Sequence, residues 1–167
     1  MRPDLQIIRG GAERIADLEP LYRELHTHHV AVAPRLAGLP PRTAAESWTC
    51  RRARYEEWLA APDAFVLVAE QRGQPIGFVL VTTVVGYQAW ASADRVGEVH
   101  DLVVARPSRA AGVGTALMDA VESQLAWLGI REYRVTAITA NEDALRFYES
   151  RGMTLVSHVL LGHIDAG

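Results

Sequence analysis

The chain has 167 residues, of which 49% are apolar and 22% are charged, and its formal net charge is −3. This length suits one domain with a single core, and the near balance of charge argues against a nucleic-acid partner. No apolar run reaches the roughly 20 residues of a membrane span, and Met1 to Asp4 lead into no signal-peptide core. We therefore expect a single domain over 1–167, located in the cytoplasm, with no membrane partner. The single cysteine, Cys50, excludes an internal disulfide and argues against a cysteine-based metal site.

Apolar periodicity and turn residues divide the first half of the chain into alternating elements. A strand is predicted at 5–9, a helix at 12–30, a proline-rich loop at 33–41 and a second helix from 43 or 44 to 59. Two strands follow at 64–70 and 75–85, joined by Arg72-Gly73-Gln74 in the manner of a hairpin.

The second half continues this alternation. After a linker at 86–95 we predict a strand at 96–104, a helix from 115 to 128 that Gly129 stops, a strand at 132–139, a short helix before Gly152, and a last strand at 154–161. This order predicts an α/β fold in which a central mixed sheet carries helices on both faces.

The turn between the 96–104 strand and the next helix is rich in small residues, Arg109-Ala110-Ala111-Gly112-Val113-Gly114-Thr115. Backbone amides at a helix start can cradle a phosphate, although a tight turn with positive φ explains the glycines equally well. A nucleoside-triphosphate loop would contain a lysine here, and a dinucleotide fingerprint would have a small residue where Leu117 stands. Both nucleotide interpretations are therefore disfavoured.

A second constellation lies on the short predicted helix. Asn141 is a suitable N-cap, Glu142 and Asp143 suit the positive first turn, and Gly152 suits the end. Asn141, Ala144 and Tyr148 then fall within one stripe of the helix.

With these two motifs in order, the chain resembles the GNAT superfamily of acetyl-CoA-dependent N-acetyltransferases over about residues 96–156. Arg109-x-x-Gly112-x-Gly114 resembles the family's pyrophosphate loop, and Asn141-x-x-Ala144-x-x-Phe147-Tyr148-x-x-x-Gly152-Met153 resembles its second motif. The resemblance implies transfer of an acetyl group from acetyl-CoA, as co-substrate and without a metal, to a primary amine by direct attack in a ternary complex.

Several alternatives stay open beside this interpretation. The acceptor can be a small molecule or a peptide amine, including a protein N-terminus or lysine. Ala110 and Ala111 stand where the family often has a glycine and a basic residue, which leaves room for a coenzyme A sensor without turnover. A homodimer through a sheet edge or the last strand is a further expectation.

The resemblance also implies which residues contact acetyl-CoA. Backbone groups of Leu102 and Val104 would bind the pantetheine arm and the thioester carbonyl, as an oxyanion hole does. The predicted contacts along the strand, the loop and the short helix are Leu102, Val103, Val104, Arg109, Ala110, Ala111, Gly112, Val113, Gly114, Thr115, Asn141, Ala144, Phe147 and Tyr148. Arg109 is either a phosphate ligand or a brace of the loop, and Phe147 also suits the core.

Acetylation requires a neutral amine, so a proton must leave before or during attack. Glu98 is the first candidate base, and His100, two residues further along the strand and on the same side if it has no bulge, is its rival. Asp101 is expected to point the opposite way and to be structural. Tyr148 is the candidate acid that protonates the departing thiolate, a role that the resemblance implies; packing on the sheet is the alternative.

Two other clusters favour ordinary structural roles. His26, His28 and His29 match no zinc signature and suit a solvated helix end. Trp48, Tyr55 and Trp58 recur at helical spacing, which indicates packing, although part of that face, with Tyr87 and Trp90, could line the acceptor pocket.

Overall fold

The computed structural model describes residues 4–164, which divide into two compact units. The first comprises 1–27 and 42–136, and the second comprises 28–41 and 137–167. Each unit is described by itself, and a single domain over 1–167 stays a prediction.

The first unit contains a five-stranded mixed sheet in the order β1-β2-β3-β4-β5. Its strands are β1 (Leu5–Gly10), β2 (Phe65–Gln71), β3 (Gln74–Val85), β4 (Arg95–Val104) and β5 (Tyr133–Val135). β1 to β4 pair antiparallel, and β5 joins β4 in parallel. The predicted hairpin turn is present, with positive φ at Arg72 and Gly73.

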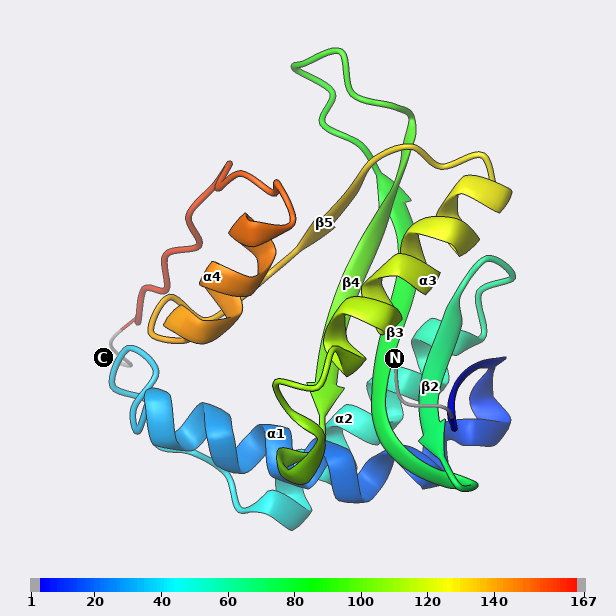
Figure 1. Cartoon of the computed structure of the whole chain (residues 1–167). Helices are drawn as coiled ribbons and strands as arrows, with labels where there is room; N and C mark the ends of the chain where they lie inside the picture. The colour runs from blue at the N-terminus through cyan, green and yellow to red at the C-terminus, as the bar shows by residue number, and fades with distance from the viewer. Residues whose placement is uncertain (1–3, 165–167) are drawn as a thin grey trace. The chain divides into compact units, whose positions relative to one another are not determined.

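Helices cover both faces of this sheet, as predicted (Figure 1). A short 3-10 turn, η1 (Ala12–Arg14), leads into α1 (Ile15–Val32); α2 (Ala44–Leu59) follows, and α3 (Val113–Trp127) comes after β4 and a second 3-10 turn, η2 (Arg106–Ser108). A capping box between Thr43 and Glu46 starts α2. Apolar side chains of α1 and α2 pack on one face of the sheet in a cluster that includes Leu18, Tyr55, Phe78 and Val103.

The opposite face of the sheet holds α3, and a glycine lets its first turn lie close. A Cβ on Gly77 of β3 would stand 2.8 Å from the carbonyl oxygen of Val103 and 3.3 Å from the Leu117 side chain. No larger residue fits there without movement of the backbone. Gly77 therefore helps to fix where the start of α3 lies on the sheet.

β4 contains a bulge that sequence reasoning did not predict. Leu80 of β3 pairs with Asp101, but the next residue, Val81, pairs with Val99, so His100 is an extra residue in β4. His100 and Asp101 both contact side chains of α2. The prediction that Asp101 points away from His100 is therefore wrong, because it assumed plain alternation along the strand.

The second unit carries α4 (Glu142–Ser150), whose N-cap is Asn141 as predicted. Leu36 and Leu39 form a small bridge in the proline-rich loop. The predicted strand at 154–161 is wrong, since residues 153–164 form no regular element, and apolar side chains such as Val159 and Leu160 are exposed there. β-branched composition makes a strand only where a partner edge accepts its hydrogen bonds.

The predicted strand at 132–139 is also too long. Only Tyr133–Val135 is strand, because the pairing with β4 stops at Val99. The remainder of that segment runs on as a turn toward α4.

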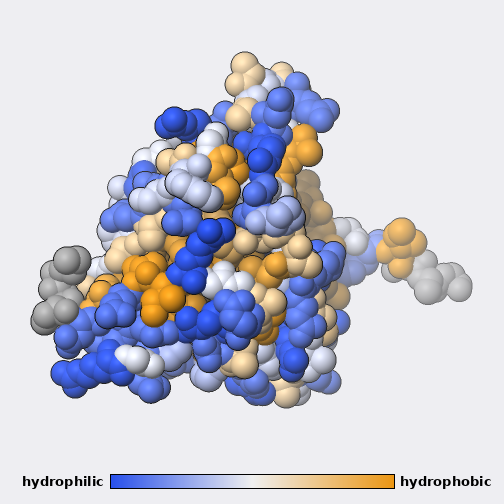
Figure 2. Space-filling model, turned by 90° about the vertical axis from the view of Figure 1, so that its right-hand side faces the viewer, coloured by the Kyte–Doolittle hydropathy of each residue, from blue (hydrophilic) through white to orange (hydrophobic). Residues whose placement is uncertain are grey.

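The face drawn in Figure 2 is largely hydrophilic, with small apolar patches between polar side chains. Across residues 4–164, no helix combines the length and the apolar character needed to cross a membrane.

Candidate active site

The start of α3 presents a run of backbone N–H groups. Among residues 4–164, none of the six amides from Ala110 to Thr115 donates a hydrogen bond of ordinary distance and angle to another residue, although 109–112 form a turn; the next amide, that of Ala116, donates to the Gly112 carbonyl at 3.0 Å. Helix N-termini leave such donors available, and the helix dipole adds a partial positive charge. The loop therefore has the donor set of an anion site.

Two left-handed residues shape this loop. Gly112, the N-cap of α3, has φ 80°, and Ala110 has φ 56°. Residues of this kind curve the chain so that successive amides face a common concavity. The alanine at position 110 therefore keeps the conformation that a glycine would adopt, at a cost in strain.

Arg109 braces the same loop. Its Nε donates to the carbonyl oxygen of Val104, the last residue of β4, at 3.0 Å. Of the two predicted roles for Arg109, this contact shows the brace; phosphate binding stays a prediction.

The end of β4 has an edge that no strand covers within the described residues, because β5 stops pairing at Val99. The Ala105 amide donates to the Ile76 carbonyl at 2.8 Å, and hydrogen bonds to one neighbour recur at every second residue. The main-chain groups of Leu102 and Val104 therefore face the uncovered edge. This is the geometry required by the predicted pantetheine contacts.

Val103 differs from its two neighbours. Its main-chain groups face β3 by the same alternation, and its side chain is 2% exposed in the core against α1 and α2. The predicted contact of Val103 with the cofactor is therefore not supported, because the residue places no group at the open edge.

Both candidate bases lie on β4 and are engaged by neighbours. The carboxylate of Glu98 forms an ion pair with Arg134 of β5. His100 Nε2 shares a hydrogen bond of 2.8 Å with the hydroxyl of Thr82 on β3. Its ring also stacks on Trp58 of α2, with centroids 3.6 Å apart and an interplanar angle of 13°.

The imidazole of His100 is uncharged at neutral pH. Burial, and after it the charge of nearby guanidinium groups, lowers its pKa from the ordinary 6.5 to about 4. These guanidinium groups belong to Arg51, Arg54 and Arg134. A neutral imidazole can accept a proton, whereas an imidazolium cannot.

A buried polar network lies behind His100. The Tyr55 hydroxyl donates to Asp101 at 2.7 Å, and Arg51 Nε lies 3.7 Å from the same carboxylate oxygen. Burial raises the pKa of Asp101 and, together with Asp101, that of Tyr55. Asp101 is thus structural, as predicted, although its direction is not.

The second unit holds the remaining predicted residues, all on or beside α4. Asn141 Oδ1 accepts from the Ala144 amide at 3.4 Å and contacts His28 Nε2 at 3.2 Å. The ring of Tyr148 packs edge-on against Phe147, with centroids 5.3 Å apart. The second motif therefore folds as an N-capped helix that groups these residues.

Sequence reasoning missed two partnerships. His28 was assigned to a solvated helix end, yet it binds Asn141. Trp58 was assigned to packing, yet it stacks on His100. Helical spacing placed Trp58 on the face of α2 that meets the sheet, but only the tertiary fold shows which strand residue it meets.

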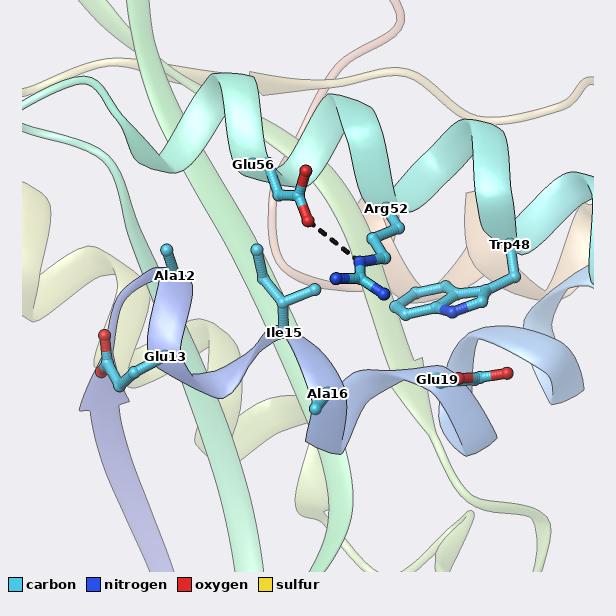
Figure 3. Close-up of a pocket in the computed structure, with 8 residues that line it drawn as sticks. All are labelled: Ala12, Glu13, Ile15, Ala16, Glu19, Trp48, Arg52 and Glu56. Atoms are coloured by element: carbon cyan, nitrogen blue, oxygen red, sulfur yellow. Dashed lines mark hydrogen bonds and ion pairs between the residues drawn. The ribbon is translucent and has the colours of Figure 1, made fainter.

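A separate groove of about 320 Å³ lies between the start of α1 and α2 (Figure 3). Arg52 projects into it from α2 and pairs with Glu56 of the same helix at 2.9 Å, beside Trp48, and Glu13 and Glu19 lie on the opposite wall. None of the candidate catalytic or acetyl-CoA-contacting residues lines this groove, although Trp48, from the face considered for the acceptor pocket, does.

Comparison with known proteins identifies the family. A model described as the Acetyltransferase (GNAT) family matches residues 34–153, which is more than half of the chain. The chain belongs to the GNAT family of acetyltransferases. An uncharacterized N-acetyltransferase of Archaeoglobus fulgidus is 35% identical over 108 residues, covering 59% of this chain and 71% of that relative.

Solved structures agree on the GNAT fold. A GCN5-related N-acetyltransferase from Ralstonia eutropha has a TM-score of 0.74 at 20% identity, covering 98% of this chain and 99% of that one. The aminoglycoside N-acetyltransferase AAC(6')-Iy, solved in complex with CoA, has a TM-score of 0.72 at 18% identity, with 97% and 95% coverage. The predicted family and fold class are thereby confirmed.

Proposed function

We propose that this GNAT protein transfers an acetyl group from acetyl-CoA to a primary amine, by direct attack in a ternary complex. The six N–H groups from Ala110 to Thr115 carry this proposal, because they match the diphosphate of coenzyme A. Acetyl-CoA supplies an acetyl group activated as a thioester.

The uncovered edge of β4 supports the proposed position of acetyl-CoA, the acetyl donor. Main-chain groups of Leu102 and Val104 would pair with the pantetheine amides as an added strand does. An N–H at this edge would also stabilise charge that develops on the thioester oxygen. Asn141 would add a side-chain contact from the second motif while it caps α4.

Proton removal from the acceptor is assigned to the β4 face that holds Glu98 and His100. Glu98 is engaged by Arg134, whereas His100 is neutral and has Thr82 as its partner. Either side chain can act directly or through a water molecule. The pH dependence of the rate, measured in variants at these two positions, decides between them.

Tyr148 is proposed as the acid that protonates the departing thiolate of coenzyme A. No covalent acyl-enzyme is proposed, since the single cysteine, Cys50, lies exposed on α2, away in sequence from both motifs. A cytoplasmic location, the single domain and a homodimer also stay predictions.

A screen for thiol release from acetyl-CoA tests this function, with aminoglycosides, amino acids, polyamines and peptides as acceptors. We expect release of coenzyme A that depends on at least one amine, with an acetylated product of matching mass. Tight binding of acetyl-CoA by calorimetry without release for any acceptor would instead support a sensor. Absence of binding would contradict both.

A further inference from the structure

Two arginines lie over the Trp58 ring that stacks on His100 in the first unit, and a third, Arg134, pairs with Glu98 on the strand that carries His100. The guanidinium carbon of Arg54 lies 5.1 Å from the centre of the Trp58 ring, and that of Arg51 lies 5.7 Å from it. Arg134 lies 5.6 Å from the ring of Tyr87 and pairs with Glu98. These cations come from α2 and β5 and flank the candidate base on β4.

Each arginine has an acidic partner, and in two of the three pairs the arginine side chain is more exposed to solvent than the carboxylate. The side chains of Arg51, Arg54 and Arg134 are 32%, 54% and 38% exposed. Two of the partners lie deeper, since the carboxylates of Asp101 and Glu98 are 5% and 14% exposed.

The acidic partners leave guanidinium donors available to a ligand. Asp101 accepts the hydroxyl of Tyr55 at 2.7 Å, while its distance to Arg51 is 3.7 Å, beyond a hydrogen bond. Glu57, the partner of Arg54, is 64% exposed, and such surface pairs on a helix open at little cost. In the other two pairs the guanidinium groups of Arg51 and Arg134 are nearer to solvent than the carboxylates of Asp101 and Glu98.

We infer that the acceptor is an amino carboxylic acid, whose carboxylate is held by the arginines around Trp58 and His100 while its amine faces β4. This inference rests on the proposed acetyl transfer. Guanidinium groups bind carboxylates through paired, charge-assisted hydrogen bonds. The same cations disfavour an ammonium beside them, which favours the neutral amine that attack requires.

Pairs of acceptors that differ only in the carboxylate test this inference. We would compare phenylalanine with phenethylamine, histidine with histamine and lysine with cadaverine, by thiol release from acetyl-CoA. For at least one pair, kcat/KM should be about tenfold or more higher for the amino acid, as expected for a charge-assisted pair.

Substitution of one arginine tests whether the arginines cause the preference for an acceptor with a carboxylate. Arg54→Gln should raise KM for the amino acid about tenfold and leave KM for its decarboxylated partner within about twofold. Arg52→Gln is the matched control, because Arg52 lies on the same helix but pairs with Glu56 in the separate groove (Figure 3). It should change neither value.

The outcomes separate the two proposals. Turnover of amines without a carboxylate at equal or higher kcat/KM would overturn the acceptor class and leave acetyl transfer standing. An equal effect of Arg54→Gln on both members of a pair would also overturn it. Failure of every amine, with or without a carboxylate, would contradict the acetyl transfer itself.

Discussion

The phenol of Tyr148 is the single group whose loss most directly tests the chemistry. Tyr148→Phe removes only the hydroxyl, and we expect kcat to fall about 10²-fold or more because the thiolate then departs without its acid. The Kd for acetyl-CoA should stay nearly unchanged. Steady-state kinetics with calorimetry measure both quantities.

Tyr133→Phe provides the control for that substitution. Its hydroxyl donates to Glu122 at 2.7 Å on the surface of the first unit, outside the proposed chemistry. A full kcat in Tyr148→Phe, or an equal loss in both variants, would contradict the assignment of Tyr148 as the acid.

His100 should make the stability of the protein depend on pH. Its folded pKa of about 4 lies below the ordinary 6.5, so the unfolded chain takes up this proton first as the pH falls. The free energy of unfolding should therefore decrease between about pH 6.5 and 4, by on the order of 1–2 kcal/mol after allowance for partial exposure.

Urea unfolding of the protein and of His100→Gln at pH 7 and pH 4.5 measures that contribution. The stability difference between the two proteins should shrink at the lower pH, because the variant lacks the titrating ring. An equal difference at both pH values would show that His100 titrates normally.

Sequence alone predicted the candidate residues but not their partners. The second motif contains Asn141 and Tyr148, and Glu98 and His100 lie on the strand that precedes the first motif, so all four could be named as candidates from the sequence. The stack of His100 on Trp58 joins residues 42 positions apart, and no local pattern encodes such a contact. For the same reason, the brace formed by Arg109 was left open between two roles.

The start of α3 can be tested as a backbone site. Thr115 is exposed, and its amide is one of the six without an acceptor among the described residues. Thr115→Pro removes that N–H within the first helical turn, where proline is tolerated. We expect the Kd for acetyl-CoA to rise about tenfold, which corresponds to about 1.4 kcal/mol.

Thr115→Ala is the matched control, since it removes the side chain and keeps the N–H. Its Kd should stay within about twofold of the parent value by calorimetry. If the two variants weaken binding equally, the hydroxyl and not the main chain holds the ligand.

The left-handed Ala110 gives a second test of this loop. Ala110→Gly should relieve a strain of roughly 1–2 kcal/mol and cost roughly 0.5–1 kcal/mol of chain entropy, for a net gain of up to about 1.5 kcal/mol. Ala111→Gly, at a position without positive φ, should instead lower stability by roughly 0.5–1 kcal/mol. Urea unfolding that shows the same sign for both variants would contradict the assigned conformation.

Most elements could be predicted because their signals are local. Capping residues at Thr43 and Asn141, the continuous apolar runs of β2 and β3, and the Arg72-Gly73 turn each act within a few positions. The incorrect strand at 154–161 and the overlong one at 132–139 both depend on pairing with a distant edge, which composition does not report.

The two compact units raise the question of whether the whole chain unfolds as one domain, as its length predicts. All four tryptophans, Trp48, Trp58, Trp90 and Trp127, belong to the first unit, so their fluorescence reports that unit alone. Hydrogen exchange of peptides from 137–167 reports the second. One domain requires the same free energy of unfolding from both probes, whereas a lower value for the second unit would indicate two domains.

The extra residue in β4 has a consequence for how this strand tolerates change. Val81 pairs with Val99 and Leu80 pairs with Asp101, so His100 is the one residue that the ladder between β3 and β4 leaves unpaired. Deleting that one position would close the ladder into plain alternation and keep Asp101 opposite Leu80, on the side of the Tyr55 hydroxyl, but it would remove the ring that stacks on Trp58. We therefore expect a chain shortened at this position to keep its sheet and to lose the stacked, neutral imidazole.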